Sequence, residues 1–249
     1  MLLLSVAYYS SLCRFVQCCF WLDLELTLHH IIAFHRYDEV YTMSHKKLDD
    51  EFKGRASSTF KSTAWTPDFV KALTSRPDFS SMPISMLFED KCRACNRSKH
   101  PPKAKVFFSG RKYDENSLEP VDKDDSEDDA SHVSSSSELE EDSFLVGRFC
   151  AGNAEIAHTL YHWRFHLNHA VLKWLSDEGH LTPEKIVERE SWNRKKRERL
   201  ANNIVDHMDR SNEMKGLYEL FRNSLERART AQVSKISGIE RTKTDLSLA

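Results

Sequence analysis

The chain has few of the residues that interrupt regular structure, with seven glycines and seven prolines among 249 residues. This content is too low for an all-β chain and for one that is disordered along its whole length. Apolar residues make up 40% of the sequence and charged residues 30%, a balance typical of a folded protein with a charged surface. We therefore expect a mainly α-helical fold with enough residues to bury a sizeable core.

Motifs of common enzymes are also missing. The sequence contains no P-loop, no Gly-x-Ser-x-Gly motif and no glycine-rich dinucleotide fingerprint. A zinc protease needs His-Glu-x-x-His with the glutamate as general base, but between His158 and His162 that position holds Thr159. We expect a protein without catalytic activity or a small-molecule substrate, and a zinc-dependent enzyme is the weakest alternative.

The apolar N-terminal run lacks the marks of a signal peptide and of a membrane span. No basic residue precedes Arg14, whereas a signal peptide starts with a basic region. Arg14 and Gln17 interrupt the run before it reaches the roughly 20 apolar residues of a transmembrane helix. We expect residues 1–24 to form a mostly buried helix and the chain not to bind a membrane. A membrane anchor, or a start that lies outside the domain, remains an alternative.

The six cysteines form no regular disulfide framework, and a chain of this length needs none. They are Cys13, Cys18, Cys19, Cys92, Cys95 and Cys150. The first three lie in the apolar run, where a free cysteine packs as a small hydrophobic residue. We expect a reducing compartment.

The segment Cys92-Arg93-Ala94-Cys95 predicts half of a structural zinc site. A Cys-x-x-Cys turn holds two thiolates close together, which suits tetrahedral Zn²⁺. Cys150 lies in a polar, turn-like setting and is the expected third ligand. His158 is the expected fourth ligand, with His162 and His100 as alternatives. Without a metal, these residues would be packed thiols and ordinary surface histidines.

Helical periodicity covers most of the remaining chain. Helices are expected over residues 44–60, from Pro67 to the Arg76-Pro77 pair, and over 153–177, 183–210 and 214–231. Thr66 and Thr182 each precede a proline and predict N-caps, and Gly179 predicts a helix end. The expected inward positions include Ile186 in the fourth of these helices and Leu220 in the last. Residues 86–113 predict a short β-hairpin that carries Cys92 and Cys95.

Charge is distributed unevenly along the sequence. Residues 122–142 contain ten acidic residues and one lysine, so this segment carries −9, whereas the rest of the chain carries +7. Such a segment cannot bury a core, and we expect a disordered insert. Within it, Ser126 and Ser135 have an acidic residue three positions later, as acidophilic kinases prefer; a solvated insert without a regulatory role is the alternative.

A compact basic block predicts a second surface of interest. The residues that would bind nucleic acid or an import receptor are Lys185, Arg189, Arg194, Lys195, Lys196, Arg197 and Arg199. Because no glycine or proline interrupts residues 184–210, we expect one continuous helix that projects these cations. The alternative is a solvated helix face in which neighbouring glutamates balance the charge.

Several motifs in order resemble the DUF4211 domain. They are Trp65-Thr-Pro-Asp-Phe, Cys92-Arg-Ala-Cys-Asn-Arg-Ser, Phe108-Ser-Gly-Arg-Lys-Tyr, Gly147-Arg-Phe-Cys, His158-Thr-Leu-Tyr-His-Trp and Lys185-Ile-Val-Glu-Arg-Glu. This domain of unknown function occurs in fungal proteins and at the C-terminus of animal glutamine/serine-rich and proline-rich nuclear proteins. The resemblance covers roughly residues 25–232, which we expect to form one domain followed by a flexible tail over 233–249.

The resemblance implies a chromatin-associated protein of the nucleus and no established catalytic activity. The expected function is therefore that of a zinc-stabilised domain that binds a nuclear protein or a chromatin complex. Direct binding of DNA or RNA through residues 185–199 is the alternative.

Overall fold

The computed structural model describes residues 20, 24, 27–29, 31, 39–84, 91–98, 101–121 and 141–237. Its elements are, in chain order, α2 (Glu39–Arg55), the π-helix η1 (Ala56–Phe60), α3 (Pro67–Ser75), β1 (Asp78–Pro83), β2 (Ala104–Ser109), β3 (Asp142–Val146), α4 (Arg148–Tyr161), α5 (Trp163–Asp177), α6 (Pro183–Glu190), α7 (Arg194–Arg210) and α8 (Glu213–Ser237). The predicted fold class is confirmed, because helices dominate and the strands form one three-stranded antiparallel sheet in the order β1-β2-β3.

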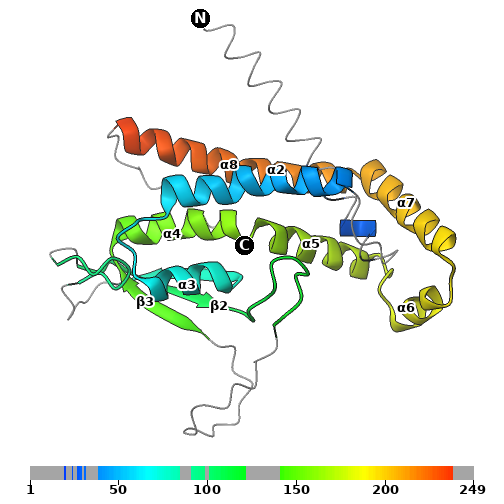
Figure 1. Ribbon diagram of the computed structural model, residues 1–249, viewed down its shortest axis with the longest axis horizontal. Helices are drawn as coiled ribbons and strands as arrows, with labels where there is room; N and C mark the ends of the chain where they lie inside the picture. Colours follow the sequence, from blue (N-terminus) through cyan, green and yellow to red (C-terminus); the bar gives the residue numbers. More distant parts are fainter. Residues whose placement is uncertain are drawn as a thin grey trace, which may run out of the picture.

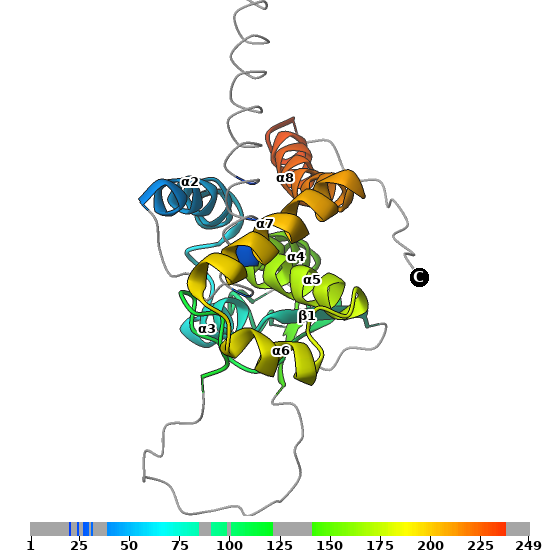
Figure 2. The ribbon, with the colours of Figure 1, turned by 90° about the vertical axis from the view of Figure 1, so that its right-hand side faces the viewer.

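The elements form three layers (Figure 1). Helices α2 and α8 make the upper layer, α4 and α5 follow one another in the middle, and α3 lies with the sheet below them. Figure 2 shows the same order from one end, with α2 and α8 on either side of the upper layer. Helix α4 contacts η1, α2, α8, α3 and two strands, so it is the central element of the fold.

The core contains two groups of aromatic rings on opposite sides of this middle layer. In the upper group, the ring centroid of Phe221 lies 4.2 Å from Phe52 and 4.6 Å from Phe20. In the lower group, Phe69 of α3 lies 5.4 Å from Phe108 and 5.1 Å from Phe144 in edge-to-face contacts, a favoured geometry for aromatic pairs. These groups hold α2 and α8 above the central helix and α3 on the inner face of the sheet.

Part of the predicted N-terminal helix is described. Phe20 and Leu24 of this segment are helical and fully buried, and so is Leu28 just beyond it. Within the described part of the chain, no helix is long and apolar enough to cross a membrane. The predicted insert lies outside the described residues from 122 to 140, together with Ser126 and Ser135, and so does the tail from 238. The insert boundary is corrected at its end, because Asp142 begins β3.

The predicted helix boundaries are confirmed where a cap defines them. Thr66 accepts a hydrogen bond from the backbone N–H of Phe69, and Thr182 accepts one from Lys185, with a proline at the start of each helix. Gly179 has a φ of +67°, and the N–H groups around it close the end of α5. The sequence alone predicts these helix ends because each capping residue and the backbone group that it satisfies are neighbours in the sequence.

Two predicted continuous helices are each divided in the structure. The helix over 153–177 is interrupted at His162, whose φ and ψ are −96° and 16°. The helix over 183–210 stops at Glu190 and restarts at Arg194, because Asn193 accepts a hydrogen bond from the Lys196 N–H and begins a new helix. An asparagine cap can therefore divide a helix that contains no glycine or proline.

Two predicted inward positions are wrong. Ile186 and Leu220 have exposed fractions of 36% and 67%. Ile186 lies on the short helix α6, where Arg189 is the one buried residue of the helix. The division of the 183–210 helix separates α6 from the face of α7 that packs against the core.

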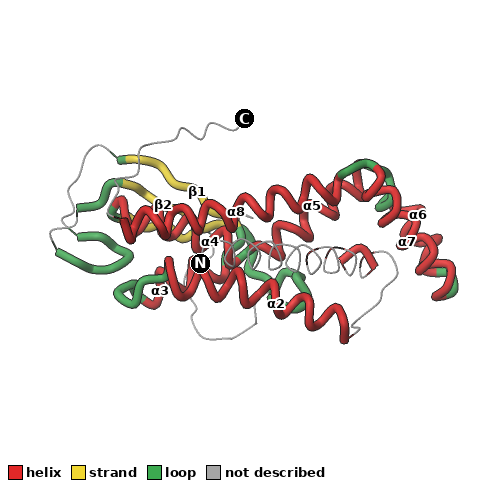
Figure 3. The backbone as a smooth tube through the Cα atoms, turned by 90° about the horizontal axis from the view of Figure 1, so that it is seen from above, coloured by secondary structure: helices red, strands yellow, loops and turns green. Residues whose placement is uncertain are grey.

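The predicted hairpin is present with a corrected first strand. Its two strands are β1 and β2, which pair from Asp78 with Ser109 to Pro83 with Ala104. The cysteine turn lies in their connection, where Lys91 and Ser98 form an isolated β-bridge. β3 adds the third strand on the other side of β2, so residues before and after the acidic segment lie side by side (Figure 1). Figure 3 shows β1 and β2 next to each other.

Gly110 follows β2 in a conformation that few other residues adopt. Its φ is +89°, and a Cβ at this position would lie 2.6 Å from the Asp78 carboxylate and 2.9 Å from Cγ of Pro77. Its carbonyl also accepts a hydrogen bond from the buried Arg76. Gly110 therefore allows the close approach between the end of α3 and the end of β2.

We predict that Gly110→Ala lowers the free energy of unfolding by about 1–3 kcal/mol, since it combines backbone strain with a steric clash. Gly54→Ala is the matched control, because Gly54 lies in α2 with no atom within 4 Å of the added Cβ. The control should raise stability by about 0.5–1 kcal/mol. Urea titration of both variants tests this, and equal stabilities would contradict the prediction.

Candidate metal centre

The cysteine turn is a tight loop closed by its own backbone. The N–H of Asn96 donates to the Cys92 carbonyl at 2.8 Å, and Asn96 has a φ of +52°. Asparagine is one of the few residues other than glycine that adopts this left-handed conformation readily. The backbone therefore reverses direction directly after Cys95, and the thiols of Cys92 and Cys95 stay on one turn.

Two neighbouring elements hold this turn in place. The N–H of Arg93 donates to the Leu145 carbonyl of β3 at 2.8 Å, and the N–H of Thr66 donates to the Ala94 carbonyl at 2.7 Å. Ala94 and Cys92 are fully buried. The turn is thus fixed between the start of α3 and the last strand of the sheet, next to the point where α4 begins.

The fold brings Cys150 to this turn. Cys150 is the third residue of α4, and its Sγ lies with those of Cys92 and Cys95 in a cluster in which all three sulfurs are within 4.8 Å of one another. Tetrahedral Zn²⁺ with Zn–S bonds of about 2.3 Å requires sulfurs separated by about 3.8 Å. The three cysteines can therefore hold a metal ion after a small adjustment. They are the cysteines that the sequence analysis selected for this role.

Polar hydrogens around the sulfurs favour the thiolate form. The N–H of Gly147 points at the Cys92 sulfur at 3.3 Å, and the indole N–H of Trp65 points at the Cys150 sulfur at 3.4 Å. A hydrogen bond from the Cys150 thiol and then backbone N–H groups lower the pKa of Cys92 to about 5, against the effect of burial. The hydrogen bond with Cys92, and then burial, raise the pKa of Cys150. The cluster therefore holds one thiolate readily, and a bound cation would supply the charge that keeps the others deprotonated.

Trp65 and Gly147 donate to sulfurs of the candidate site, and the sequence analysis did not assign either residue to it. Groups that donate to a metal-bound ligand orient it and tune its basicity. Trp65 precedes the predicted N-cap Thr66, and Gly147 lies close to the predicted ligand Cys150. Their role could not be predicted from the sequence, because each donates to a sulfur of another element: Trp65 to Cys150 and Gly147 to Cys92. Trp65 is also 6% exposed, so it shields the cluster from solvent on its side.

The structure does not place His158 or His162 at the sulfurs, which corrects the predicted fourth ligand. Nε2 of His158 lies 2.8 Å from the Arg76 carbonyl, and Nε2 of His162 lies 2.9 Å from the Leu73 carbonyl. A carbonyl oxygen only accepts, so both rings must carry a proton on Nε2. His100 lies outside the described residues, and among the described ones the cluster contains the three cysteines alone.

These two histidines cap the C-terminal end of α3. The last carbonyls of a helix lack partners within the helix, and here His158 of α4 and His162, which directly follows α4, satisfy two of the carbonyls in this region. The His158 and His162 rings lie 4.3 Å apart and are 3% and 1% exposed. The His-x-x-x-His pattern thus joins α4 to α3, and this explains it without a metal.

Burial keeps both rings neutral. It lowers the pKa of His158 to about 3 and that of His162 to about 4. Nδ1 of His162 accepts a hydrogen bond of 2.6 Å from the Tyr113 hydroxyl, because Nε2 already holds the ring proton. Burial also raises the pKa of Tyr113, so this hydroxyl stays protonated.

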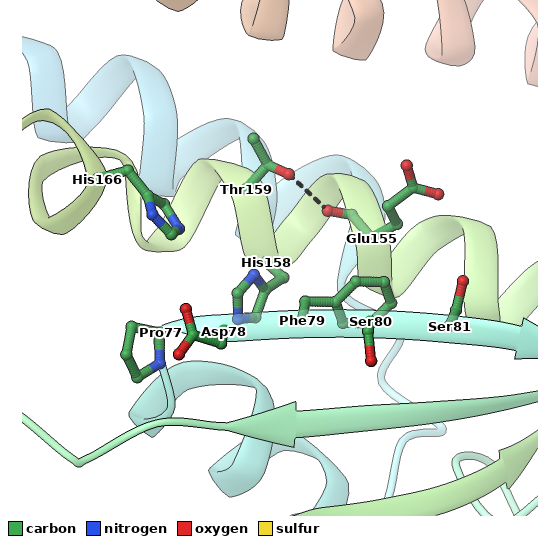
Figure 4. A pocket seen from close by; sticks show the side chains of 9 residues that line it. All are labelled: Pro77, Asp78, Phe79, Ser80, Ser81, Glu155, His158, Thr159 and His166. Carbon is green, nitrogen blue, oxygen red and sulfur yellow. Dashed lines mark hydrogen bonds between the residues drawn. The ribbon is translucent and has the colours of Figure 1, made fainter. Parts of the chain in front are cut away.

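A hollow of about 460 Å³ lies beside these histidines, between β1 and the junction of α4 and α5 (Figure 4). Its lining is mostly polar and comprises Pro77, Asp78, Phe79, Ser80, Ser81, Glu155, His158, Thr159 and His166. The Thr159 hydroxyl is used within its own helix, since it donates to the Glu155 carbonyl at 2.9 Å. The hollow contains no group of three close metal-ligating atoms among the described residues.

The predicted basic surface is only partly exposed. Lys185, Arg194, Lys195, Lys196 and Arg199 face solvent, and Arg197 is half-buried. Arg189 is 3% exposed and donates to the His180 carbonyl, so it does not belong to this surface. Arg194 pairs with Glu198 at 2.6 Å, and the Lys196 ammonium lies 3.6 Å from the ring centroid of Trp192.

Comparison with known proteins supports the resemblance to DUF4211. Residues 10–118 match the family described as Domain of unknown function (DUF4211), which confirms the predicted resemblance. The match begins before the predicted start at residue 25 and ends well before residue 232. The matched range includes Cys92 and Cys95 but not Cys150. An uncharacterized protein of Schizosaccharomyces pombe is 24% identical over 125 residues, which are 50% of this chain and 18% of that protein. The chain therefore corresponds to less than a fifth of that relative. No solved structure matches the chain significantly.

Proposed function

We propose that the chain is a non-catalytic interaction domain of the nucleus that is stabilised by one structural zinc ion. The observation that carries this proposal is the cluster of Cys92, Cys95 and Cys150 sulfurs, which two elements of the fold bring within 4.8 Å of one another. Three thiolates are soft ligands, which favour zinc over magnesium or calcium. A nuclear protein or chromatin complex is the proposed partner, on the strength of the resemblance to DUF4211.

A structural role suits the position of the cluster better than a catalytic one. Cys92 is fully buried, and Trp65 covers the Cys150 sulfur. A catalytic zinc site needs an open position for water and substrate, together with a general base. The side-chain groups that hydrogen-bond to the Cys92 and Cys150 sulfurs are a neighbouring thiol and the Trp65 indole, and neither is a carboxylate or an imidazole that could serve as the general base. A metal here would instead join the cysteine turn to the first turn of α4.

Elemental analysis of the purified chain tests the metal. We expect about one zinc per chain in the wild type and none in Cys92→Ser. The triple variant Cys13→Ser, Cys18→Ser, Cys19→Ser is the control and should retain the zinc, because the sequence predicts that these cysteines pack as small hydrophobic residues. His100→Ala tests the one predicted fourth ligand that the structure does not direct elsewhere, and it should lower zinc affinity if His100 is a ligand. A folded wild type without metal would contradict the proposal.

A second candidate function is binding of nucleic acid or an import receptor through the start of α7. The exposure of Arg194, Lys195, Lys196 and Arg199 favours it. Figure 1 shows α6 and α7 at the end of the molecule away from the sheet, where a partner could reach them. The neighbouring acidic residues Glu184, Glu188 and Glu190 reduce the net charge of this region.

We predict that changing these four cations together to glutamine leaves the fold intact, since exposed charges contribute little to stability. The free energy of unfolding should change by less than about 1 kcal/mol, and nuclear accumulation of a fluorescent fusion should fall. Lys46, Lys47, Lys71 and Lys215, four other exposed lysines, provide a control with the same charge change. If both variants accumulate in the nucleus like the wild type, the basic block is a solvated helix face.

A further inference from the structure

The surface around the cysteine turn is basic and carries an exposed aromatic ring. Arg93, Arg97, Lys103 and Arg148 all face solvent. None of the described residues in 91–98, 101–105 and 147–151 is acidic. At the start of α7, by contrast, Glu198 lies within the basic block, and Glu184, Glu188 and Glu190 precede it in α6.

Backbone hydrogen bonds bring these cations to one place. The N–H of Arg93 binds Leu145, and the N–H of Lys103 binds Val146, which are consecutive residues of β3. Gly147 follows and donates to the Cys92 sulfur, and Arg148 comes next. The cysteine turn, the residues before β2 and the distant segment from Leu145 to Arg148 therefore meet at the end of the sheet where α4 begins.

Phe149 lies within this basic surface and is 75% exposed, the most exposed large apolar side chain of the described residues. It sits between Arg148 and the candidate ligand Cys150, in the first turn of α4. The Arg148 guanidinium lies over its ring at 5.3 Å from the centroid. A ring held at a helix start beside a cluster of cations offers a flat face for stacking.

We propose that this surface, formed by Arg93, Arg97, Lys103, Arg148 and Phe149, binds single-stranded nucleic acid. Proteins that bind single strands combine a positive surface for the backbone with aromatic rings on which bases stack. An acidic peptide would match the charge but has no planar base to cover Phe149. A duplex would match the charge too, but its bases are already stacked. The inference rests on the proposed zinc site, because the metal would hold Arg93 and Arg97 in position relative to Phe149.

The test uses the whole chain and a fluorescein-labelled 15-nucleotide oligothymidine, with binding followed by fluorescence anisotropy. We expect Phe149→Ala to weaken binding by roughly 5- to 150-fold, the range observed for the loss of one stacking ring. Leu220→Ala removes a comparably exposed apolar side chain at another site and should leave affinity within twofold of the wild type.

Two matched charge variants separate the candidate surfaces. The knuckle variant Arg97→Gln, Lys103→Gln, Arg148→Gln removes three cations from this surface, and the α7 variant Arg194→Gln, Lys195→Gln, Lys196→Gln removes three at the other end of the molecule. With four phosphate contacts, wild-type affinity should fall about 50-fold between 50 and 200 mM salt. The knuckle variant should lose most of this salt dependence, whereas the α7 variant should keep it.

Several outcomes would overturn the inference. They are no binding of oligothymidine, equal weakening by both charge variants, equal affinity for a 15-base-pair duplex without dependence on Phe149, and binding of a polyglutamate peptide in place of the oligonucleotide. Zinc content is measured for every variant. A zinc-loaded wild type that does not bind defeats this inference alone, whereas a zinc-free, folded wild type defeats the proposed metal site.

Discussion

Replacing Cys150 by serine is expected to abolish zinc binding and to lower the free energy of unfolding by about 4 kcal/mol. This value corresponds to a ligand present at a thousandfold excess over its dissociation constant. For a domain of this size the melting temperature should fall by about 8–16 °C. The effect is large because the metal would join α4, the central helix, to a turn fixed on β3 and α3.

The comparison that tests this result is thermal unfolding with and without a strong chelator. The chelator should lower the melting temperature of the wild type to that of Cys150→Ser and should leave the variant unchanged. Cys18→Ser is the control, and it should still respond to the chelator because it keeps the metal. A wild type that is insensitive to the chelator, and as stable as Cys150→Ser, would show that the three thiols are packed without a metal.

Lowering the pH from 7 to 5 should cost the wild type about 3–4 kcal/mol through His158 and His162. Their pKa values are about 3 and 4 in the folded chain, against about 6.5 when unfolded. Below pH 6.5 the unfolded chain therefore binds protons that the folded chain does not bind, and stability falls as the pH decreases. This contribution is fully present above pH 6.5 and is lost progressively towards pH 4 and 3.

Glutamine at both positions separates this effect from acid release of a metal. The amide nitrogen of glutamine can still donate to the Arg76 and Leu73 carbonyls, but it does not titrate. The double variant His158→Gln, His162→Gln should be less stable at pH 7 because it loses ring packing, but its stability should depend less on pH between 7 and 5. His169→Gln, at an exposed position, should behave like the wild type. Parallel pH profiles of the wild type and the double variant in urea titration would contradict the prediction.

The sequence by itself was sufficient wherever a signal and its partner lie within one turn of backbone. Thr66, Thr182 and Gly179 mark helix ends because each cap acts on a backbone group a few residues away. The spacing of Cys92 and Cys95 likewise predicted a tight turn with two thiols, and the mainly helical class followed from periodicity and from the shortage of glycine and proline. Asn193 is also a local signal, because it caps α7 and divides the helix that was predicted to be continuous over 183–210.

The tertiary structure decided which distant groups meet. It placed Cys150 at the cysteine turn, as predicted, but directed His158 and His162 to the end of α3. It also buried Arg189 and left Ile186 and Leu220 exposed. The physical reason is that a histidine or an arginine side chain has several suitable partners, among them metals, carboxylates and carbonyl oxygens. Only the packing of the helices and the sheet determines which of these partners lies within hydrogen-bonding distance.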